Sequence, residues 1–170
     1  LLPDNFVSDY HSVHFRADTV GLDIQVFEAT LLRFQSNEER VDSDDLAQQV
    51  TLAVSQYRGQ FLEGLSLKDC ERFESWLLHE QTYWQQQRVK LLDRLLYYHG
   101  RQDDFEVVQL FARQWLTIEP WNEKAHRHLM TALALEGQFD AALAQYERCQ
   151  QALQLELEVE PAPETRDLYE

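Results

Sequence analysis

The sequence predicts an all-α fold of about seven helices with a short β segment at its N-terminus. Its 170 residues include only five glycines and four prolines, so few residues favour the tight turns of a β-rich fold. Hydrophobic residues make up 44% of the chain and aromatic residues 12%, which is enough for a buried core. Beyond residue 22, apolar residues recur at steps of three and four, the period of an amphipathic helix.

The first 22 residues follow a different pattern. Residues 13–15 alternate apolar and polar side chains and precede Gly21, which indicates a short strand and a turn. Such a segment is too small to form a sheet by itself. We interpret residues 1–22 as the trailing segment of a preceding domain or as a hairpin against the helices, and residues 23–170 as the helical domain.

The first two helices are recognised by their capping residues. Asp23 is predicted as the N-cap of the first helix, whose apolar residues continue to Phe34. Ser43 or Asp42 is predicted to cap the second helix, which Gly59 ends. An apolar loop then leads to the third helix.

Five further helices are bounded by glycine and proline. They are predicted, in chain order, over residues 70–99, 105–118, 122–136, 139–155 and 164–169. Gly100 and Gly137 are expected to end the first and third of these, and Pro120 closes the second, because proline cannot continue a helix. Pro161 and Pro163 separate the last helix from the one before it.

An internal repeat is visible in the second half of the chain. A shift of 34 residues places Leu95 on Leu129 and Phe105 on Phe139. This is the period of tetratricopeptide repeats, in which stacked helical hairpins cover each other's apolar faces. The small residue Ala142 would let paired helices approach closely. The sequence therefore favours tetratricopeptide-like helical hairpins, with an ordinary helical bundle as the alternative.

The charge of the chain restricts its partners. It carries 15 basic and 30 acidic residues, a formal net charge of −15. Such a surface repels phosphate backbones, which makes direct nucleic-acid binding by this segment unfavourable. No apolar run approaches the ~20 residues that cross a membrane. We expect a cytoplasmic location, no membrane association, and protein partners.

The sequence predicts no catalytic, cofactor or metal site. Glu123 and His126 have the spacing of half a di-iron site, but a second such motif is missing. We interpret Glu123 as a carboxylate favoured in a first helical turn and His126 as a packed residue. No nucleophile motif, phosphate-binding loop or Cys-x-x-Cys pair is present in the sequence. The chain is therefore predicted not to be an enzyme, and a helical metal protein or enzyme remains the weakest hypothesis.

The tryptophans have two interpretations. They could line a ligand pocket, although such aromatic residues more often fill helix interfaces, and Trp121 is expected to be partly exposed. The four are Trp76, Trp84, Trp115 and Trp121.

A candidate partner-binding face follows from the repeat. In tetratricopeptide arrays the first helix of each pair lines the concave face. The 34-residue alignment places there Lys90, Asp93, Tyr97, Lys124, Arg127 and Thr131. The basic members stand out on an acidic chain and could hold the carboxylates of a partner. The alternative is a solvated face with local ion pairs, which contribute little to stability.

Several segments, in order along the chain, resemble one family. They are LDIQVFE at 22–28, YRGQFLEG at 57–64, EPWNEKAHRHLM at 119–130, GQFDAAL at 137–143, YERC at 146–149 and EPAPETRDLY at 160–169. Together they resemble the bacterial transcriptional activator domain of regulators such as the Streptomyces antibiotic regulatory proteins. Glu158 departs from the pattern, because the family often has glycine there, so we expect a local difference in that turn.

The resemblance implies a non-catalytic regulatory and protein-interaction domain of a bacterial transcriptional regulator. In that family a winged-helix DNA-binding domain precedes this one, and it is absent from the sequence, so no residue here is assigned to DNA recognition. The implied partners are RNA polymerase, neighbouring domains of the full-length regulator, or a second protomer. The alternative is a tetratricopeptide-like scaffold or adaptor unrelated to transcription.

Overall fold

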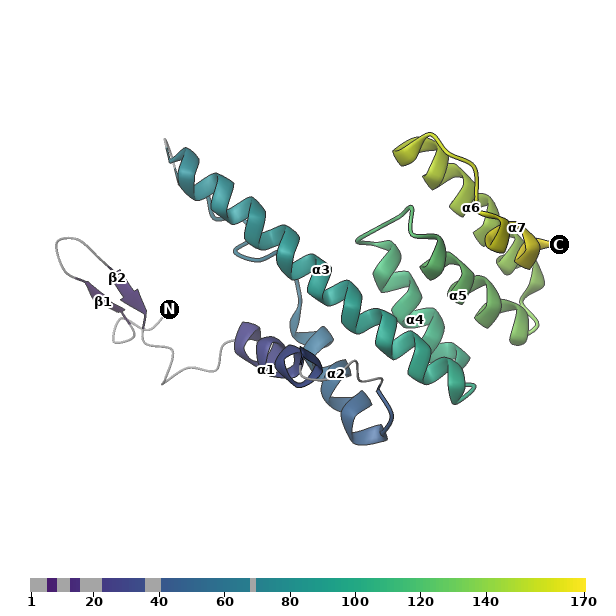
Figure 1. The fold of residues 1–170 in the computed structure, drawn as a ribbon, viewed down its shortest axis with the longest axis horizontal. Helices are drawn as coiled ribbons and strands as arrows, with labels where there is room; N and C mark the ends of the chain where they lie inside the picture. The colour runs from purple at the N-terminus through teal and green to yellow at the C-terminus, as the bar shows by residue number, and fades with distance from the viewer. Residues whose placement is uncertain (1–5, 9–12, 16–22, 36–40, 68–69) are drawn as a thin grey trace.

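The computed structural model describes residues 6–8, 13–15, 23–35, 41–67 and 70–170 (Figure 1). Seven helices occupy these residues: α1 (Asp23–Gln35), α2 (Asp44–Gln56), α3 (Glu71–Arg101), α4 (Phe105–Leu116), α5 (Glu123–Leu135), α6 (Phe139–Leu157) and α7 (Pro163–Tyr169). Each corresponds to one of the predicted helices, although α3 and α6 extend beyond their predicted ends, and this confirms the helical part of the predicted fold class.

The prediction that a β segment belongs to this fold is wrong, because the described part of the domain from residue 23 onward is helical throughout its regular structure. Two three-residue strands, β1 (Phe6–Ser8) and β2 (Val13–Phe15), pair antiparallel with each other alone. Figure 1 shows them apart from the helices, so they add no element to the array. Two strands this short cannot bury an apolar face of their own. Gly21 lies outside the described residues, and the interpretation of residues 1–22 stays a prediction.

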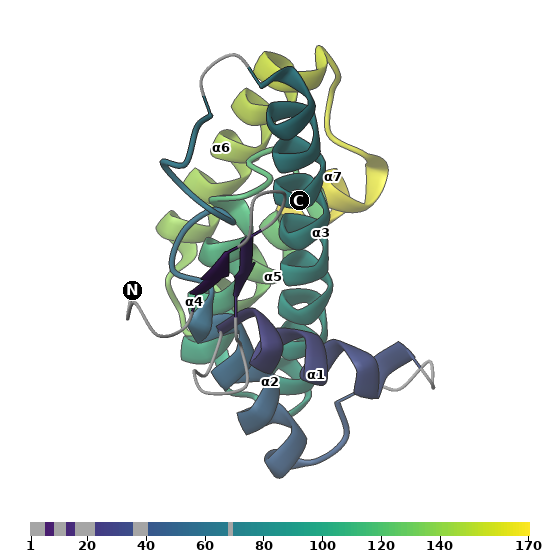
Figure 2. The same ribbon diagram turned by 90° about the vertical axis from the view of Figure 1, so that its left-hand side faces the viewer.

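The helices form a stack in which each one packs against the next along the chain. In addition, α5 contacts both α3 and α7, so these three helices form one layer, with α4 and α6 behind them (Figures 1 and 2). The core runs through all of the first six helices. Its fully buried side chains include Val50, Ala53, Leu91, Leu92, Leu95, Leu96, Ala112 and Ala125.

The tryptophans divide between core and surface. Trp84 and Trp115 are buried, and Trp121 is partly buried. Trp76 lies on the first half of α3, which extends beyond the other helices in Figure 1, and 44% of its surface is exposed. The expectation of a core position is therefore wrong for Trp76, whose ring contacts Phe61 and Phe73 at the surface.

Local hydrogen bonds explain where several helices begin. The Leu46 N–H donates to Ser43 Oγ at 3.4 Å, so Ser43 is the cap of α2. The Ala125 N–H likewise donates to Asn122 Oδ1 at 3.1 Å at the start of α5. Asp23, predicted as a cap, is instead the first residue of α1.

Two helices are followed by a residue other than glycine in the left-handed backbone conformation. Helix α3 continues through Gly100, contrary to prediction, and the chain turns at Asp103 with φ of 56°. Its turn is closed by a 3.1 Å hydrogen bond from the Asp104 N–H to the His99 carbonyl. Glu158 ends α6 with φ of 57° and ψ of 33°. A side chain other than glycine is strained in this region.

Glu158→Gly is expected to stabilise the protein by about 0.5–1 kcal/mol, because glycine adopts this backbone conformation without a Cβ clash. Glu156→Gly is the matched control, since it lies two residues earlier inside α6 and should destabilise the protein by about 1 kcal/mol. Urea unfolding of the two variants measures both changes. If Glu158→Gly lost as much stability as the control, Glu158 would not be in a strained left-handed conformation.

A buried histidine joins α5 to α6 and to the turn before α5. In His126, Nδ1 lies 2.6 Å from Gln145 Nε2 and Nε2 lies 2.8 Å from the Pro120 carbonyl oxygen. Because the Gln145 amide donates to Nδ1, the proton of the neutral ring is on Nε2 and is donated to the carbonyl. Burial lowers the pKa of His126, while the Pro120 hydrogen bond and the Glu123 charge oppose this in part.

We expect the free energy of unfolding to fall as the pH is lowered from about 7.5 to about 5. The unfolded chain takes up a proton at His126 near its usual pKa, whereas the folded chain takes it up only at lower pH. His126→Gln should therefore flatten the pH dependence of stability, measured by urea unfolding across this range. The control is His79→Gln, at an exposed position on α3. If the free energy of unfolding changed equally with pH in the wild type and in His126→Gln, His126 would not be a buried neutral imidazole.

No helix among the described residues combines the length and the apolar character needed to cross a membrane.

Candidate partner-binding groove

A groove of about 600 Å³ lies between the end of α3, the start of α4, and helices α5 and α7. Its lining combines apolar, basic and acidic side chains. It is formed by Leu96, Tyr97, Gly100, Arg101, Asp103, Phe105, Val108, Lys124, Arg127, His128, Thr131, Ala132, Leu135, Glu164 and Leu168.

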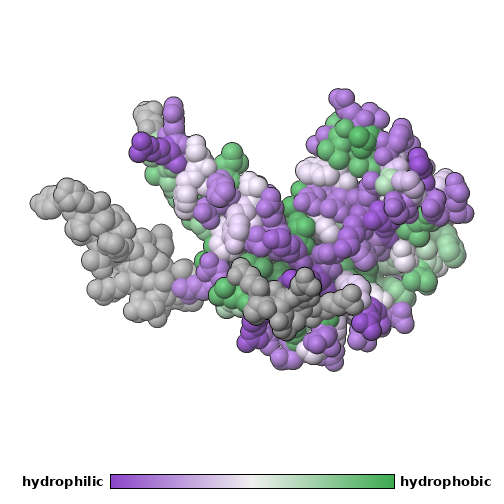
Figure 3. All heavy atoms as spheres, viewed as in Figure 1, coloured by the Kyte–Doolittle hydropathy of each residue, from purple (hydrophilic) through white to green (hydrophobic). Residues whose placement is uncertain are grey.

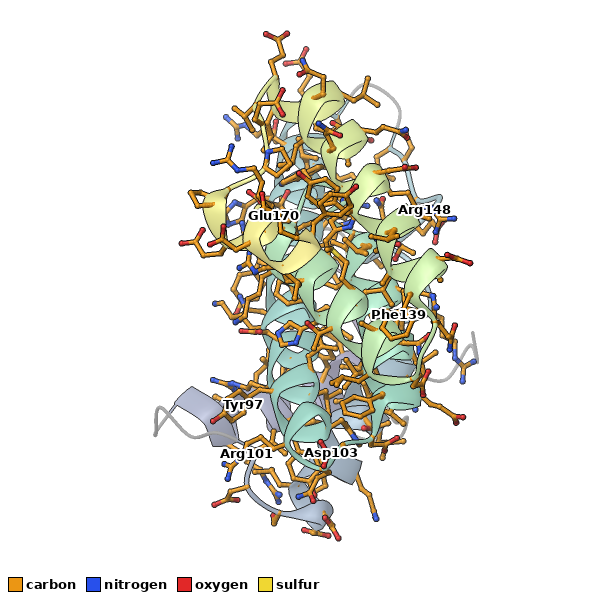
Figure 4. The ribbon with its side chains drawn as sticks, turned by 90° about the vertical axis from the view of Figure 1, so that its right-hand side faces the viewer. Tyr97, Arg101, Asp103, Phe139, Arg148 and Glu170 are labelled. Atoms are coloured by element: carbon orange, nitrogen blue, oxygen red, sulfur yellow. The ribbon has the colours of Figure 1, made fainter. Side chains whose placement is uncertain are left out.

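The structure brings together in this groove four of the six residues that the repeat places on one face. They are Tyr97, Lys124, Arg127 and Thr131. Lys90 does not line it, and its ammonium group lies 3.2 Å from Gln87 Oε1 on the same helix. Figure 4 shows Tyr97 and Arg101 on the side of the array that carries α7, and Phe139 and Arg148 of α6 on the other side. That these residues bind a partner stays a prediction.

The charge of Lys124 is partly used within the protein. Its Nζ lies 2.6 Å from Asp93 Oδ1 and 2.8 Å from Oδ2, across the contact between α5 and α3. Both side chains are substantially exposed, so this ion pair contributes little to stability. The pair agrees with the alternative interpretation of this face as one with local ion pairs, but the lysine stays accessible to a partner.

The C-terminal segment is attached to α5 by a partly buried set of hydrogen bonds. Glu123 Oε2 accepts from the Ala162 N–H at 2.8 Å and from the Thr165 hydroxyl at 2.5 Å. Arg127 in turn donates to Thr165 Oγ1 at 2.9 Å. The Thr165 side chain is fully buried. Glu123 therefore orders α7 against α5, and α7 forms one wall of the groove.

These hydrogen bonds give Glu123 and His126 separate roles, although their spacing is that of half a di-iron site. Glu123 is bonded to the C-terminal segment, whereas His126 is bonded to Pro120 and Gln145. Within the described residues, no three side chains of the metal-binding types gather closely enough to hold an ion. The two residues thus have separate structural roles.

The groove is less acidic than the rest of the chain. Burial lowers the pKa of His128, and the neighbouring Lys124 and Arg127 charges lower it further, while Asp93 opposes them. The imidazole is therefore neutral near pH 7. The Arg101 guanidinium lies 5.9 Å from the centroid of the Tyr97 ring. Basic groups next to exposed apolar side chains suit a polypeptide segment that carries both carboxylates and apolar residues.

Sequence reasoning missed the contribution of α7 and of the α3–α4 turn to this groove. Leu168 of α7 and Asp103 of the turn both line it. The 34-residue repeat places residues on a face, but it carries no information on how the C-terminal segment packs. The apolar residues of the segment at 160–169 were the available signal.

Thr165→Val is expected to lower stability by about 1–3 kcal/mol, because it removes the hydroxyl that joins Arg127 to Glu123 and leaves each of these partly buried side chains with one hydrogen bond fewer. The control is Thr131→Val, since Thr131 is exposed on α5 and should change stability by less than about 0.5 kcal/mol. Urea unfolding measures both variants. Hydrogen exchange at 163–169 should become faster in Thr165→Val, and unchanged exchange there would contradict this role.

The family model described as bacterial transcriptional activator domain matches residues 22–170. No curated protein matches the chain significantly. Because the family match covers most of the sequence, including the helices that form the groove, the chain belongs to the bacterial transcriptional activator domain family.

Proposed function

We propose that the chain is a non-catalytic, tetratricopeptide-like interaction domain of a cytoplasmic bacterial transcriptional regulator of the Streptomyces antibiotic regulatory protein type. It acts next to a DNA-binding domain and transmits the DNA-bound state to a protein partner. The family match supports the transcriptional context over a scaffold unrelated to transcription. The packing of each helix against the next, with α3, α5 and α7 in one layer, supports the repeat-like architecture.

The groove is the observation that carries the proposal. It places Lys124 and Arg127 beside Tyr97 and Leu168, so one surface offers both hydrogen-bond donors and apolar contacts. A partner segment with carboxylates would displace Asp93 from Lys124, which is feasible because the pair is exposed. The candidate partners are RNA polymerase, a neighbouring domain of the regulator, or a second protomer.

The net charge of −15 supports protein over nucleic acid as the ligand of this domain. The partner binds to helical surfaces that are already formed, without a chemical reaction. The domain therefore acts only through its affinity for the partner. Its effect on transcription then depends on how tightly the partner is held in the groove.

Lys124→Glu in the full-length regulator is expected to weaken partner binding at least about tenfold, because a charge-assisted contact is replaced by repulsion. Occupancy of DNA in cells, measured by chromatin immunoprecipitation, should be retained. Transcription of the bound genes, measured by RNA sequencing, should fall toward the level of a strain that lacks the regulator.

The matched control is Lys90→Glu, which makes the same charge change on α3 outside the groove. This variant should retain both DNA occupancy and the transcriptional response. Equal loss of response in the two variants would attribute the effect to net charge, and a normal response in Lys124→Glu would reject the groove as the interaction surface.

A further inference from the structure

A cleft of about 290 Å³ lies away from the groove, where α4 and α6 both pack on α5. It is bounded by the end of α4, the α4–α5 turn, the first half of α5 and the middle of α6. Figure 4 shows Arg148 of α6 on the side of the array away from Tyr97 and Arg101. The cleft is lined by Arg113, Leu116, Thr117, Pro120, His126, Leu129, Gln145, Arg148 and Ala152.

Two arginines, Arg113 and Arg148, give this cleft its charge. Both side chains are exposed, and neither forms an ion pair with a residue that the structure describes. Arg113 Nη2 donates to Gln109 Oε1 at 2.8 Å, which is a neutral acceptor, and the Arg148 guanidinium has no acceptor among the described residues. Most of the hydrogen-bond donors of the two guanidinium groups are therefore available to a ligand.

No carboxylate is among the described residues that line the cleft, although the chain has 30 acidic residues and only 15 basic ones. Glu147, the neighbour of Arg148 in the sequence, does not line it. Glu119 in the α4–α5 turn does not line it either, and its Oε2 accepts from Trp115 Nε1 at 2.7 Å and from Asn122 Nδ2 at 2.8 Å. The cleft is thus a local region of positive charge on an acidic protein, and such a region attracts anions.

The buried part of the lining is neutral and is fixed by its own hydrogen bonds. His126 and Gln145 are both buried and are joined by the 2.6 Å contact between Nδ1 and Nε2. His126 Nε2 also lies 2.8 Å from the Pro120 carbonyl oxygen. These bonds hold α5, α6 and the α4–α5 turn together below the arginines. The apolar side chains of Leu116 and Ala152 are partly exposed beside them, so a ligand would meet charged and apolar groups together.

We propose that this cleft binds a phosphate monoester, with Arg113 and Arg148 donating hydrogen bonds to the phosphoryl oxygens and Leu116 and Ala152 contacting the organic part. A phosphate monoester carries a charge of about −1.5 to −2 at pH 7, which two guanidinium groups neutralise. The guanidinium fork also matches the spacing of phosphoryl oxygens.

The volume of the cleft restricts the ligand to a small one, because it is near the lower end of the roughly 300–1,000 Å³ that is typical of small-molecule sites. Such a ligand would join α4 to α6 across α5. This inference does not depend on the proposed function, because it concerns a different surface with different residues.

The probe is phenyl phosphate, and the protein is the chain of residues 1–170. We expect saturable binding by isothermal titration calorimetry. In a nitrogen–proton correlation spectrum, the shifts should be largest at the amide signals of residues 113–120 and 145–152. Phenyl sulfate has nearly the same shape but a single negative charge, so its Kd should be at least about fivefold higher.

The phosphoryl group can belong to a free ester or to a phosphorylated side chain of a protein. A short peptide that carries phosphothreonine distinguishes these two sources. A lower Kd for this peptide than for phenyl phosphate would support the side chain, and a higher Kd would support the free ester. The same peptide without the phosphoryl group should not bind.

Arg148→Gln and Arg113→Gln should each raise the Kd of phenyl phosphate at least about tenfold, as expected for lost hydrogen bonds between charged groups. Arg148→Gln is the cleaner test, because the Arg148 guanidinium is exposed and has no partner among the described residues. The matched control is Arg72→Gln, which makes the same charge change at an exposed arginine of α3 outside the cleft. This control should leave the Kd unchanged.

Three results would overturn the proposal. One is the absence of saturable binding at millimolar phenyl phosphate. A second is an equal rise of the Kd in Arg148→Gln and Arg72→Gln, which would attribute binding to the net charge of the protein. The third is that the largest shifts occur at residues 97–103, which would place the anion in the groove instead. The spectrum of Arg148→Gln without the probe shows directly whether weaker binding reflects unfolding.

Discussion

The fold depends on the second half of α3, which is buried over a wide part of its own surface. Leu91, Leu92, Leu95 and Leu96 are all fully buried, and neighbours in the sequence point about 100° apart on a helix. A single helix cannot cover a face this wide. Helices α2 and α4 therefore both pack on α3, and α5 contacts it as well. Each such side chain contributes roughly 1.5–3 kcal/mol on burial. The start of α3 extends from the array in Figure 1, and Figure 3 shows hydrophilic residues over much of the same face of the molecule.

A second constraint is polar and acts at the C-terminal end of the stack. Glu123 accepts hydrogen bonds from Ala162 and Thr165, and α7 consequently lies against α5. The left-handed conformation of Glu158 ends α6 and turns the chain toward this site. Tyr169 also stacks on Tyr146 of α6, with ring centroids 4.2 Å apart. Together these contacts build the wall without which Lys124 and Arg127 would lie on an open face rather than in a groove.

The sequence by itself determined the helices, because helical periodicity, capping at Ser43 and breakers such as Gly137 are local properties. It also predicts which positions lie on one face of the array, since Lys124 follows Lys90 by one 34-residue period. Only the tertiary structure decided that Lys124 lines a groove and Lys90 does not, because α7 and the α3–α4 turn complete that surface from distant parts of the chain.

The structure differs from several other predictions for the same reason, because contacts between distant residues decide them. The partners of Glu123 are 39 and 42 residues away in sequence, which no local pattern reveals. The end of α3 at Arg101 rather than before Gly100, and the exposure of Trp76, likewise depend on which neighbours cover each segment. Local sequence determines which backbone conformations are favourable, whereas long-range packing determines which side chains share a site.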